Sequence, residues 1–563
     1  MVWRLLERDE DVVDRLAEEL GLPRLVAGLL ANRGVRSVED AHLFLSPGKA
    51  PLHDPALLAD MPQAVERVAR ALRGRERIVV YGDYDVDGLT STALMATALR
   101  DFGGEVSTYV PDRLEEGYGL NAEAVEKLAA GGADLIVTVD CGVCARQEVA
   151  RAAALGVDVV VTDHHVPQAI LPPAHAVVNP KRIDCPYPFN DLAGVGVAYK
   201  LACALAGEMG EDSGLMDRFA DLVGLGTVAD VMPLIGENRA LVDRGLRALS
   251  VTSRPGLRAL AREAGLDGGE VTARQVAFQL APRLNAGGRL GDAGSALSLL
   301  LCSDPEAAVV IAGRLELANR RRQHLQDGIL EEALSMLEAD PSLGESGVIV
   351  LAREGWHQGV VGIVASKLVD RLGKPVILLC VEEGRARGSG RSVDGFDLYG
   401  MVSKVSEMLS AYGGHAMAVG LSLPAERVDG LRDALSEIAA VMPEISPELS
   451  LDAEISLEEV RPGLPRLLAL LEPYGTGNEP PLFLVRSVVV RGRPRVVGKG
   501  HLKFNVEQGN RRIGCIGFGL SERSSELGEG PVDLAARVRV DQWLGVETLC
   551  LEVEDIRPAG VGQ

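Results

Sequence analysis

The sequence is poor in aromatic residues, which make up 4% of its 563 residues, although hydrophobic residues of all kinds make up 47%. Its cores must therefore be aliphatic and rich in alanine. A charged fraction of 25% completes the balance of a globular enzyme and excludes a disordered or fibrous chain. At about 150 residues per domain, this length predicts about three or four domains.

Cysteine is also scarce, and its eight residues are scattered at positions 141, 144, 185, 203, 302, 380, 515 and 550. Such scatter favours a reducing compartment over a disulfide framework. Cys141 and Cys144 form one C-x-x-C pair, but a zinc site would need a second pair or histidines at ligand spacing. We interpret the pair as packed thiols beside the end of a strand.

A secretory signal is missing from the start of the sequence, and no apolar run reaches the roughly eighteen residues that a membrane span needs. We therefore expect a cytoplasmic protein.

Basic residues are outnumbered, since 58 Lys and Arg against 80 Asp and Glu give a net charge of −22. This balance argues against a protein that coats nucleic acid without specificity. One segment departs from it, because no Asp or Glu occurs between Leu482 and Lys503. Its basic residues are Arg486, Arg491, Arg493, Arg495, Lys499 and Lys503. They form either a nucleic-acid contact or a solvated face of a β-domain.

Short aliphatic runs alternate with helical patterns between residues 65 and 200. The runs at 78–81, 135–139 and 157–161 predict strands, and 90–99 and 146–154 predict helices. Continuous apolar runs separated by helices are typical of a parallel sheet covered on both faces. A mainly helical region over 215–340 follows, and then a second α/β block with strands at 347–351 and 375–379, a helix over 360–371 and glycine-rich turns.

After Pro480 and Pro481, short alternating strands are expected at 482–490, 493–497, 502–506, 512–518, 532–540 and 548–556. Five or six short strands over so few residues predict a small β-barrel, with the oligonucleotide-binding (OB) fold as the leading candidate.

The segment Gly82–Gly88 follows a buried strand, opens a helix and carries Asp83, Asp85 and Asp87. Three converging carboxylates repel one another unless cations bind. The pattern also begins like a calcium-binding EF-hand loop, which requires Glu six residues after the glycine. That position is Leu94, and a strand precedes the loop, so the calcium interpretation is disfavoured.

Acids and histidines also follow the next two predicted strands, as Asp140 and as Asp163-His164-His165. Ligands in open α/β sheets bind beyond the carboxyl ends of the strands, so these groups should share one crevice. Asp230 is a further candidate ligand. Carboxylates with one or two imidazoles favour Mn²⁺ or Mg²⁺, and two such ions catalyse phosphoester hydrolysis.

With Asp163-His164-His165 and Tyr81–Gly88 taken together, the sequence resembles the DHH phosphoesterase superfamily, and within it the single-strand-specific DNA exonucleases. Further matching segments are Leu284–Gly291, Trp356–Lys367, Gly388–Ser392 and Gly413–Ala416, the last three typical of the DHH-associated C-terminal domain. Nearly the whole chain is covered. The resemblance implies a 5′-to-3′ exonuclease of single-stranded DNA that acts in repair and recombination.

The resemblance also implies roles for individual residues. Asp85 and Asp140 would hold one ion, whereas Asp87, Asp140, His164 and Asp230 would hold the other. Asp83 and Asp163 would be auxiliary acids, and His165 would face the scissile phosphate. Where relatives that cleave small phosphates have a metal-binding histidine, this sequence has Tyr81, which leaves the first ion with fewer protein ligands.

Substrate phosphates are expected on Ser389 and Arg391, on His415 in Gly413–Ala416, and on Arg289. For each, a simple tight turn is the alternative. In the barrel, the candidates are Arg491, Arg493, Arg495 and Lys499.

The predicted architecture is a parallel-sheet DHH domain joined by a long helix to a smaller α/β DHH-associated domain, with a C-terminal OB-like barrel. The domains are expected at 1–60 (N-terminal helical element), 61–305, 306–340 (connecting helix), 341–460 and 461–563. Expected partners are single-stranded DNA, a helicase and a single-strand-binding protein, with the chain itself a monomer.

Two rival functions stay open. A DHH enzyme for short oligonucleotides or cyclic dinucleotides would need neither the long connector nor the barrel. A noncatalytic replication scaffold of the same ancestry would be expected to have lost metal ligands, and every expected acid is present.

Overall fold

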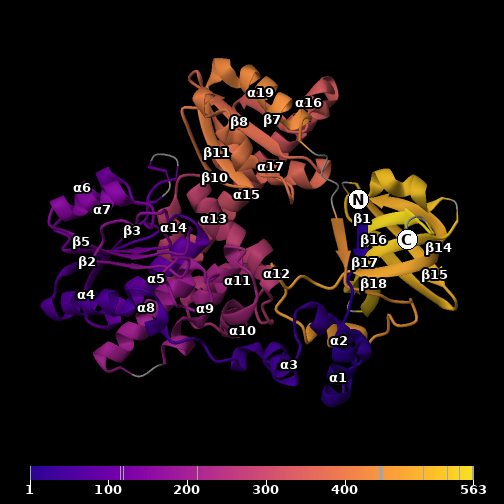
Figure 1. Ribbon diagram of the computed structural model, residues 1–563, viewed down its shortest axis with the longest axis horizontal. Coiled ribbons are helices and arrows are strands. Elements are labelled where there is room, and N and C mark those ends of the chain that lie inside the picture. Colours follow the sequence, from indigo (N-terminus) through magenta and orange to yellow (C-terminus); the bar gives the residue numbers. More distant parts are fainter. Residues whose placement is uncertain are drawn as a thin grey trace. The chain divides into compact units, whose positions relative to one another are not determined.

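The computed structural model describes residues 2–113, 116–117, 119–211, 214–442, 448–498, 500–528, 530–543 and 546–560 (Figure 1). The chain divides into two compact units. The terminal unit comprises Met1–Pro51, Pro233–Ala240 and Glu448–Gln563, and the central unit comprises Leu52–Met232 and Leu241–Pro447. The five domain ranges expected from the sequence stay predictions. None of the described helices is both long and apolar enough to span a membrane.

A five-stranded parallel sheet of order β3-β2-β4-β5-β6 organises the first part of the central unit. Its strands are β2 (Arg77–Tyr81), β3 (Glu105–Tyr109), β4 (Leu135–Val139), β5 (Asp158–Thr162) and β6 (Ala176–Val178). Helices α6 (Ala122–Ala130) and α7 (Arg146–Ala154) cover one face, and α4 (Met61–Gly74), α5 (Val86–Asp101) and α8 (Gly194–Met209) cover the other (Figure 1). The predicted parallel sheet is confirmed.

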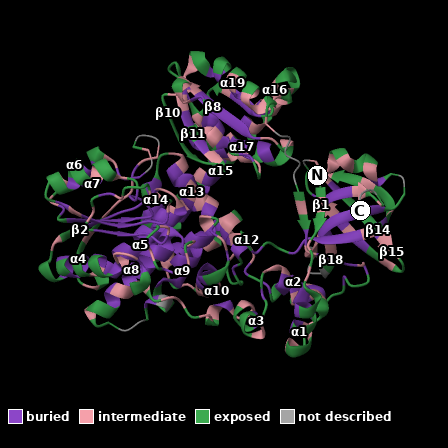
Figure 2. Ribbon diagram, viewed as in Figure 1, coloured by how far each residue is buried: buried purple, intermediate pink, exposed green. Residues whose placement is uncertain are grey.

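Burial explains which strands could be predicted. Every residue of β4 is buried, as expected for a central strand covered on both faces, and Figure 2 shows the sheet and α5 mostly in the buried colour. Strand β3 lies at the edge, is partly exposed and has alternating polar residues. It lacks the apolar run that marked its neighbours, so the sequence pattern missed it.

The predicted helical region consists of short helices followed by one long helix. They are α9 (Leu215–Ala229), α10 (Gly236–Ser250), α11 (Pro255–Glu263), α12 (Ala273–Gln275), a π-helical turn (Val276–Leu280), α13 (Ala281–Arg289), α14 (Ala293–Leu301) and α15 (Pro305–Ala339). Arg289 is therefore the last residue of a helix and not part of a simple surface turn.

A mixed sheet of order β10-β11-β9-β8-β7 forms the second α/β block. Its elements are β7 (Ile349–Glu354), α17 (Gln358–Leu372), β8 (Val376–Glu382), β9 (Arg385–Arg391), α18 (Leu398–Ser403), β10 (Ala411–His415), β11 (Ala418–Pro424) and α19 (Val428–Ala440). The prediction of glycine-rich turns was wrong, because Gly388–Arg391 and Gly413–His415 lie in strands β9 and β10. At Gly388 a Cβ atom would lie 1.8 Å from the carbonyl oxygen of Leu378 on β8, so the sheet itself requires glycine.

The barrel of the terminal unit closes through β14-β15-β16-β18-β17 and back to β14. Its strands are β14 (Phe483–Val497), β15 (His501–Gln508), β16 (Arg511–Gly517), β17 (Val532–Trp543) and β18 (Val546–Pro558). The two strands predicted over 482–497 are one, β14, with a bulge between Arg491 and Arg495 where its register with β15 shifts. The predicted OB-like barrel is confirmed.

The N-terminal helices share the hydrophobic core of the barrel. Leu16 of α1 (Glu10–Leu20) and Leu29 of α2 (Arg24–Asn32) belong to the same buried cluster as Phe483 and Val506. In addition, β1 (Val2–Leu5) pairs in parallel with β12 (Glu448–Leu451). The two ends of the chain therefore fold as one unit, which no local sequence pattern indicated.

Replacement of Phe483 tests this shared core. Phe483 is fully buried, so we expect Phe483→Ala to lower the free energy of unfolding by about 3–5 kcal/mol. Phe518 is 46% exposed, and Phe518→Ala is the matched control with an expected change of less than about 1 kcal/mol. Chemical denaturation followed by circular dichroism measures both. Equal effects of the two variants would contradict the proposed core.

Candidate metal centre

The aspartate-rich loop lies between β2 and α5. Asp85 is the N-cap of α5, and its Oδ1 accepts a hydrogen bond of 3.0 Å from the amide of Gly88. A Cβ atom on Gly88 would lie 2.5 Å from the carbonyl oxygen of Asp83, so only glycine permits this tight entry into the helix. Asp83 and Asp87 are both almost completely buried.

The start of α8 orients two of the acids. Both carboxylate oxygens of Asp87 accept amide hydrogen bonds, from Gly194 at 2.7 Å and from Val195 at 2.8 Å. Unsatisfied amides at a helix N-terminus favour a carboxylate. Asp140 follows β4 with a left-handed φ of 61°, and a Cβ atom on Gly194 would lie 2.5 Å from its Oδ1. Gly194 thus makes room for one acid and binds another.

Asp163 holds the turn after β5. Its Oδ2 accepts from the amide of Val143 at 2.9 Å, and its Oδ1 accepts from the amides of His164 at 2.7 Å and His165 at 3.0 Å. Oδ1 also lies 2.8 Å from His165 Nδ1, which must carry a proton because an ionised carboxylate only accepts. These contacts fix the ring of His165 and the backbone of His164.

His164 reaches three acids from different elements. Its Nε2 lies 3.1 Å from Asp140 Oδ1, 3.5 Å from Asp230 Oδ2 and 3.9 Å from Asp87 Oδ2. Asp230 caps the C-terminus of α9, and the next residue, Val231, has a φ of 58°. A β-branched residue rarely adopts this left-handed conformation, which indicates local strain where the chain turns Asp230 into the site.

Among the residues that the structure describes, potential ligand atoms within 4.8 Å of one another form three groups. The groups are Asp83, Asp85 and Asp140; Asp87, His164 and Asp230; and Asp140, His164 and His165. Asp140 and His164 each belong to two groups, so the three merge into one centre. The structure thus brings together every predicted ligand, and it also places Asp83, predicted as an auxiliary acid, among the possible ligands of the first ion.

Several of these buried atoms have no hydrogen-bond partner. They are Oδ1 of Asp83, Oδ1 of Asp140 and both ring nitrogens of His164. Buried polar atoms are normally paired, so such a concentration of unpaired polar atoms at one point fits cations. Oxygen donors with one or two imidazoles suit Mn²⁺ or Mg²⁺.

The shifted pKa values of the buried acids and of His164 also indicate a cation site. Burial and the charge of Asp85 raise the pKa of Asp87 to about 7, and burial with the charges of Asp87 and Asp85 raises the pKa of Asp230 to about 9. Burial lowers the pKa of His164 to about 3. In the absence of cations at neutral pH, Asp87 is partly protonated, Asp230 is protonated and the His164 imidazole is neutral, so bound cations would be needed to keep the acids ionised together.

Burial lowers the pKa of His165, but its hydrogen bond to Asp163 outweighs burial and raises the value to about 9. The same pair keeps the pKa of Asp163 below its usual range, although burial raises it. At neutral pH this pair is therefore an imidazolium beside a carboxylate. His165 is half-buried, with its Nδ1 committed to Asp163.

Tyr81 is not directed at the acids. Its hydroxyl donates to the carbonyl oxygen of Gly119 at 2.9 Å, its ring stacks on Tyr109, and it is fully buried. The reduced ligand set that the sequence implied for the first ion agrees with this geometry.

A group of arginines accompanies the acids in the central unit. Burial, together with the positive charges of Arg113, Arg322 and Arg391, lowers the pKa of Arg289 to about 9. Arg391 Nη1 donates to Ser389 Oγ at 2.6 Å, and Gly362 of α17 leaves room beside both residues. Arg289 Nη1 donates to the carbonyl of Gly359, also on α17. Guanidinium groups crowded in this way favour the binding of an anion.

Sequence reasoning missed Arg113. It follows β3 in a segment without a recognisable motif, yet its guanidinium lies 5.0 Å from the centre of the Tyr84 ring. Its charge acts on Asp83 as well as on Arg289 and Arg391. Only the pairing of β3 with β2 brings it here, and that pairing is not a local sequence signal.

The remaining candidates are more exposed. His415 pairs with Ala418, which pairs with Arg391, so His415 lies in the same row of the sheet as Arg391. On the barrel, Arg493 and Arg495 are exposed, and Arg491 forms a 2.8 Å ion pair with Glu507. Lys499 lies outside the described residues.

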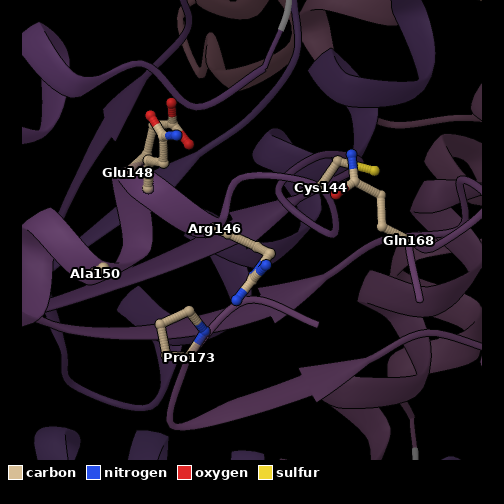
Figure 3. A pocket seen from close by; sticks show the side chains of 7 residues that line it. Cys144, Arg146, Glu148, Ala150, Gln168 and Pro173 are labelled. Atoms are coloured by element: carbon tan, nitrogen blue, oxygen red, sulfur yellow. The ribbon is translucent and has the colours of Figure 1, made fainter. Parts of the chain in front are cut away.

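A surface hollow of about 620 Å³ lies along α7 and the loop after β5, and none of the acids of the metal centre lines it (Figure 3). Cys144, Arg146 and Gln168 line it. Cys141 is buried and Cys144 is exposed, so the interpretation of packed thiols holds for Cys141 alone.

Comparison with known proteins extends over the whole chain. Three family models match: the DHH family, N-terminal domain, over residues 77–227; the DHHA1 domain over 345–441; and the RecJ OB domain over 451–555. The single-stranded-DNA-specific exonuclease RecJ of Bacillus subtilis is 39% identical over 550 residues, which are 96% of this chain and 69% of that protein. The chain belongs to the RecJ family.

RecJ structures agree with this assignment. RecJ from Thermus thermophilus in complex with Mn²⁺ superposes with a TM-score of 0.85 at 32% identity, covering 100% of this chain and 80% of that one. Its complex with Mg²⁺ superposes with a TM-score of 0.79 at 30% identity and covers 100% and 79%. The closed barrel and both α/β blocks are therefore features of the RecJ fold.

The Gly194→Ala variant tests the geometry of this RecJ-family centre. Its Cβ would displace Asp140 and disturb the amide contacts to Asp87, so we expect Mn²⁺ affinity to fall by about 10- to 100-fold. Gly207→Ala, on the same helix and with no atom within 4 Å of its Cβ, should leave affinity unchanged. Isothermal titration calorimetry measures both. Unchanged Mn²⁺ binding in Gly194→Ala would contradict the predicted ligand set.

Proposed function

We propose that this chain is a divalent-metal-dependent exonuclease that hydrolyses single-stranded DNA in the 5′-to-3′ direction, in DNA repair and recombination. The observation that carries the proposal is the merged centre of Asp85, Asp87, Asp140, His164 and Asp230 in a RecJ-family chain. Substrate class and metals agree with the names of its relatives, the single-stranded-DNA-specific exonucleases and the RecJ complexes with Mn²⁺ and Mg²⁺.

Asp85 and Asp140, with Asp83 close by, would hold one ion, and Asp87, His164 and Asp230 would complete the other around Asp140. Two divalent ions bound there would activate water and neutralise phosphate charge. The imidazolium of His165, oriented by Asp163, would donate a hydrogen bond or a proton to the phosphate group. The task of the protein is to keep these groups fixed and to exclude alternative geometries.

Arg289, Arg391 and Ser389 would bind a phosphate of the substrate, joined by Arg113. A bound phosphate would relieve the mutual repulsion of the guanidinium groups. The crowded positive charges that are unfavourable in the free protein would therefore favour phosphate binding. The chain has both the long helix α15 and the barrel, which argues against a small-molecule DHH enzyme, and its complete acid set argues against a noncatalytic scaffold. Helicase and single-strand-binding partners, a monomeric state and a cytoplasmic location stay predictions.

Replacement of Asp140 tests the reaction. We expect Asp140→Asn to abolish Mn²⁺-dependent release of nucleotides from end-labelled single-stranded DNA while leaving the fold intact, because this acid belongs to two ligand groups. Asp217→Asn, an exposed acid in the first turn of α9, should keep full activity. Chelation with EDTA should stop the wild-type enzyme, and added Mn²⁺ should restore it. Full activity of Asp140→Asn would disprove the proposed centre.

The barrel surface calls for a separate test. Arg493 and Arg495 are exposed, whereas Arg486 forms an ion pair with Glu454 at 2.8 Å. If the free arginines contact phosphates, the Arg493→Ala/Arg495→Ala variant should bind long single strands more weakly and lower the salt slope by about 1 per contact. Arg486→Ala is the control, with little change expected.

Filter binding at several salt concentrations measures the slope. An unchanged salt slope in the double variant would show that the basic segment is only a solvated face of the barrel. Deletion of residues 482–563 is a less specific test, because it would also uncover the core that the N-terminal helices share.

A further inference from the structure

A buried tyrosine and a glutamate together organise the segment between β3 and α6, which carries Arg113. Tyr81 ends β2 and pairs in register with Tyr109, the last residue of β3. The two rings stack with centres 5.1 Å apart. The Tyr81 hydroxyl donates to Gly119 at 2.9 Å and accepts from the amide group of Asn121 at 3.4 Å. The core of the sheet is thus joined to the far end of the segment.

Glu116 joins three points of the same segment. Its Oε2 accepts from the hydroxyl of Tyr109 at 2.7 Å and from Asn121 Nδ2 at 3.0 Å, and its Oε1 accepts from the amide of Asp112 at 2.9 Å. The amide of Glu116 donates back to the carbonyl of Asp112 at 2.8 Å. Asn121 in turn caps α6 through the amide of Ala124.

Charge repulsion explains why such bracing is needed. Arg113 lies in the field of Arg289 and Arg391, and repulsion among guanidinium groups would drive a loosely attached arginine into solvent. Its contact with the Tyr84 ring is a cation–π interaction, which is weak on its own. A carboxylate that closes the turn immediately around Arg113 restricts the alternative positions of this side chain before substrate arrives.

We propose that Tyr81 and Glu116 are positioning residues that form a clip and hold Arg113 ready for a phosphate of the substrate. The inference rests on the proposed function. It assigns a role to Tyr81 where DHH relatives that act on small phosphates have a metal-binding histidine: the side chain braces the arginine-bearing segment on the other side. Tyr81 and Glu116 are not catalytic residues in this proposal. They act on the substrate only through the segment that carries Arg113.

The test compares Glu116→Gln and Tyr81→Phe, each alone and combined with Arg113→Ala. A glutamine that turns its carbonyl oxygen to Tyr109 and Asn121 presents its NH₂ group to the amide of Asp112, from which it cannot accept. Phenylalanine cannot donate to Gly119, so each variant opens the clip. We expect each single variant to raise the KM for a short single strand about three- to tenfold with kcat within about twofold. In the Arg113→Ala background, the same changes should add less than about twofold.

Glu123→Gln is the matched control, because it removes one exposed carboxylate from the first turn of α6, and no hydrogen bond or ion pair among the described residues joins Glu123 to the clip. It should keep the wild-type KM. If Glu116→Gln and Tyr81→Phe reduce activity equally with and without Arg113, the clip does not act through Arg113 and the proposal is overturned. An unchanged KM in both single variants overturns it as well.

Amide hydrogen exchange over residues 110–121 separates this proposal from the proposed function. Faster exchange in Glu116→Gln than in Glu123→Gln supports the clip even if the wild-type chain fails to degrade single-stranded DNA, in which case the proposed function alone fails. Equal exchange in the two variants overturns the clip whatever the nuclease assay gives.

Discussion

Everything around the centre depends on the unfavourable burial of several acids at one edge of a parallel sheet. Isolated buried carboxylates would hold protons, and both Asp87 and Asp230 have pKa values raised far enough to do so. Cations reverse that preference. The local structure supports the acids in this state: α8 directs amides at Asp87, Gly194 leaves space for Asp140, and Val231 takes a strained conformation beside Asp230. The buried acids and the strained backbone lower the stability of the fold, and in return they direct the candidate metal ligands toward one point.

Much of this could be predicted because parallel strands put their carboxyl ends on one edge. Asp85, Asp140 and His164 each follow an apolar run, so strand prediction alone was enough to gather them. The same reasoning failed in the second sheet, because Gly388 and Gly414 permit close approach of neighbouring strands and do not form turns. Arg113 and the joining of the two chain ends depend on contacts between distant segments, which leave no periodic trace in a sequence.

The central unit separates two kinds of charge that the net value of −22 conceals. Buried acids gather around His164, and crowded arginines gather around Arg289. Each group is unfavourable alone, since burial raises the pKa of the acids and lowers that of the arginine. Cations would complement the first group and a phosphate the second, so a phosphodiester with its metals, the substrate that we propose, would satisfy both. An acidic chain can therefore bind a polyanion at one site without attracting it everywhere.

The residue at the end of β2, Tyr81, cannot both bind the first ion and pack on Tyr109, because the two roles require opposite directions of its side chain. A ligand to the first ion would have to turn toward Asp85 and Asp140, whereas Tyr81 packs its ring on Tyr109 and gives its hydroxyl to Gly119. With that ligand absent, Asp83 is the remaining group close enough to complete a set of three. An ion at this first position would then be held by carboxylates without imidazole, and hard oxygen donors alone suit Mg²⁺ as well as Mn²⁺. In the arrangement that we propose, Tyr81 leaves the first ion without an imidazole ligand and braces the segment that carries Arg113, so one side chain accounts for both features.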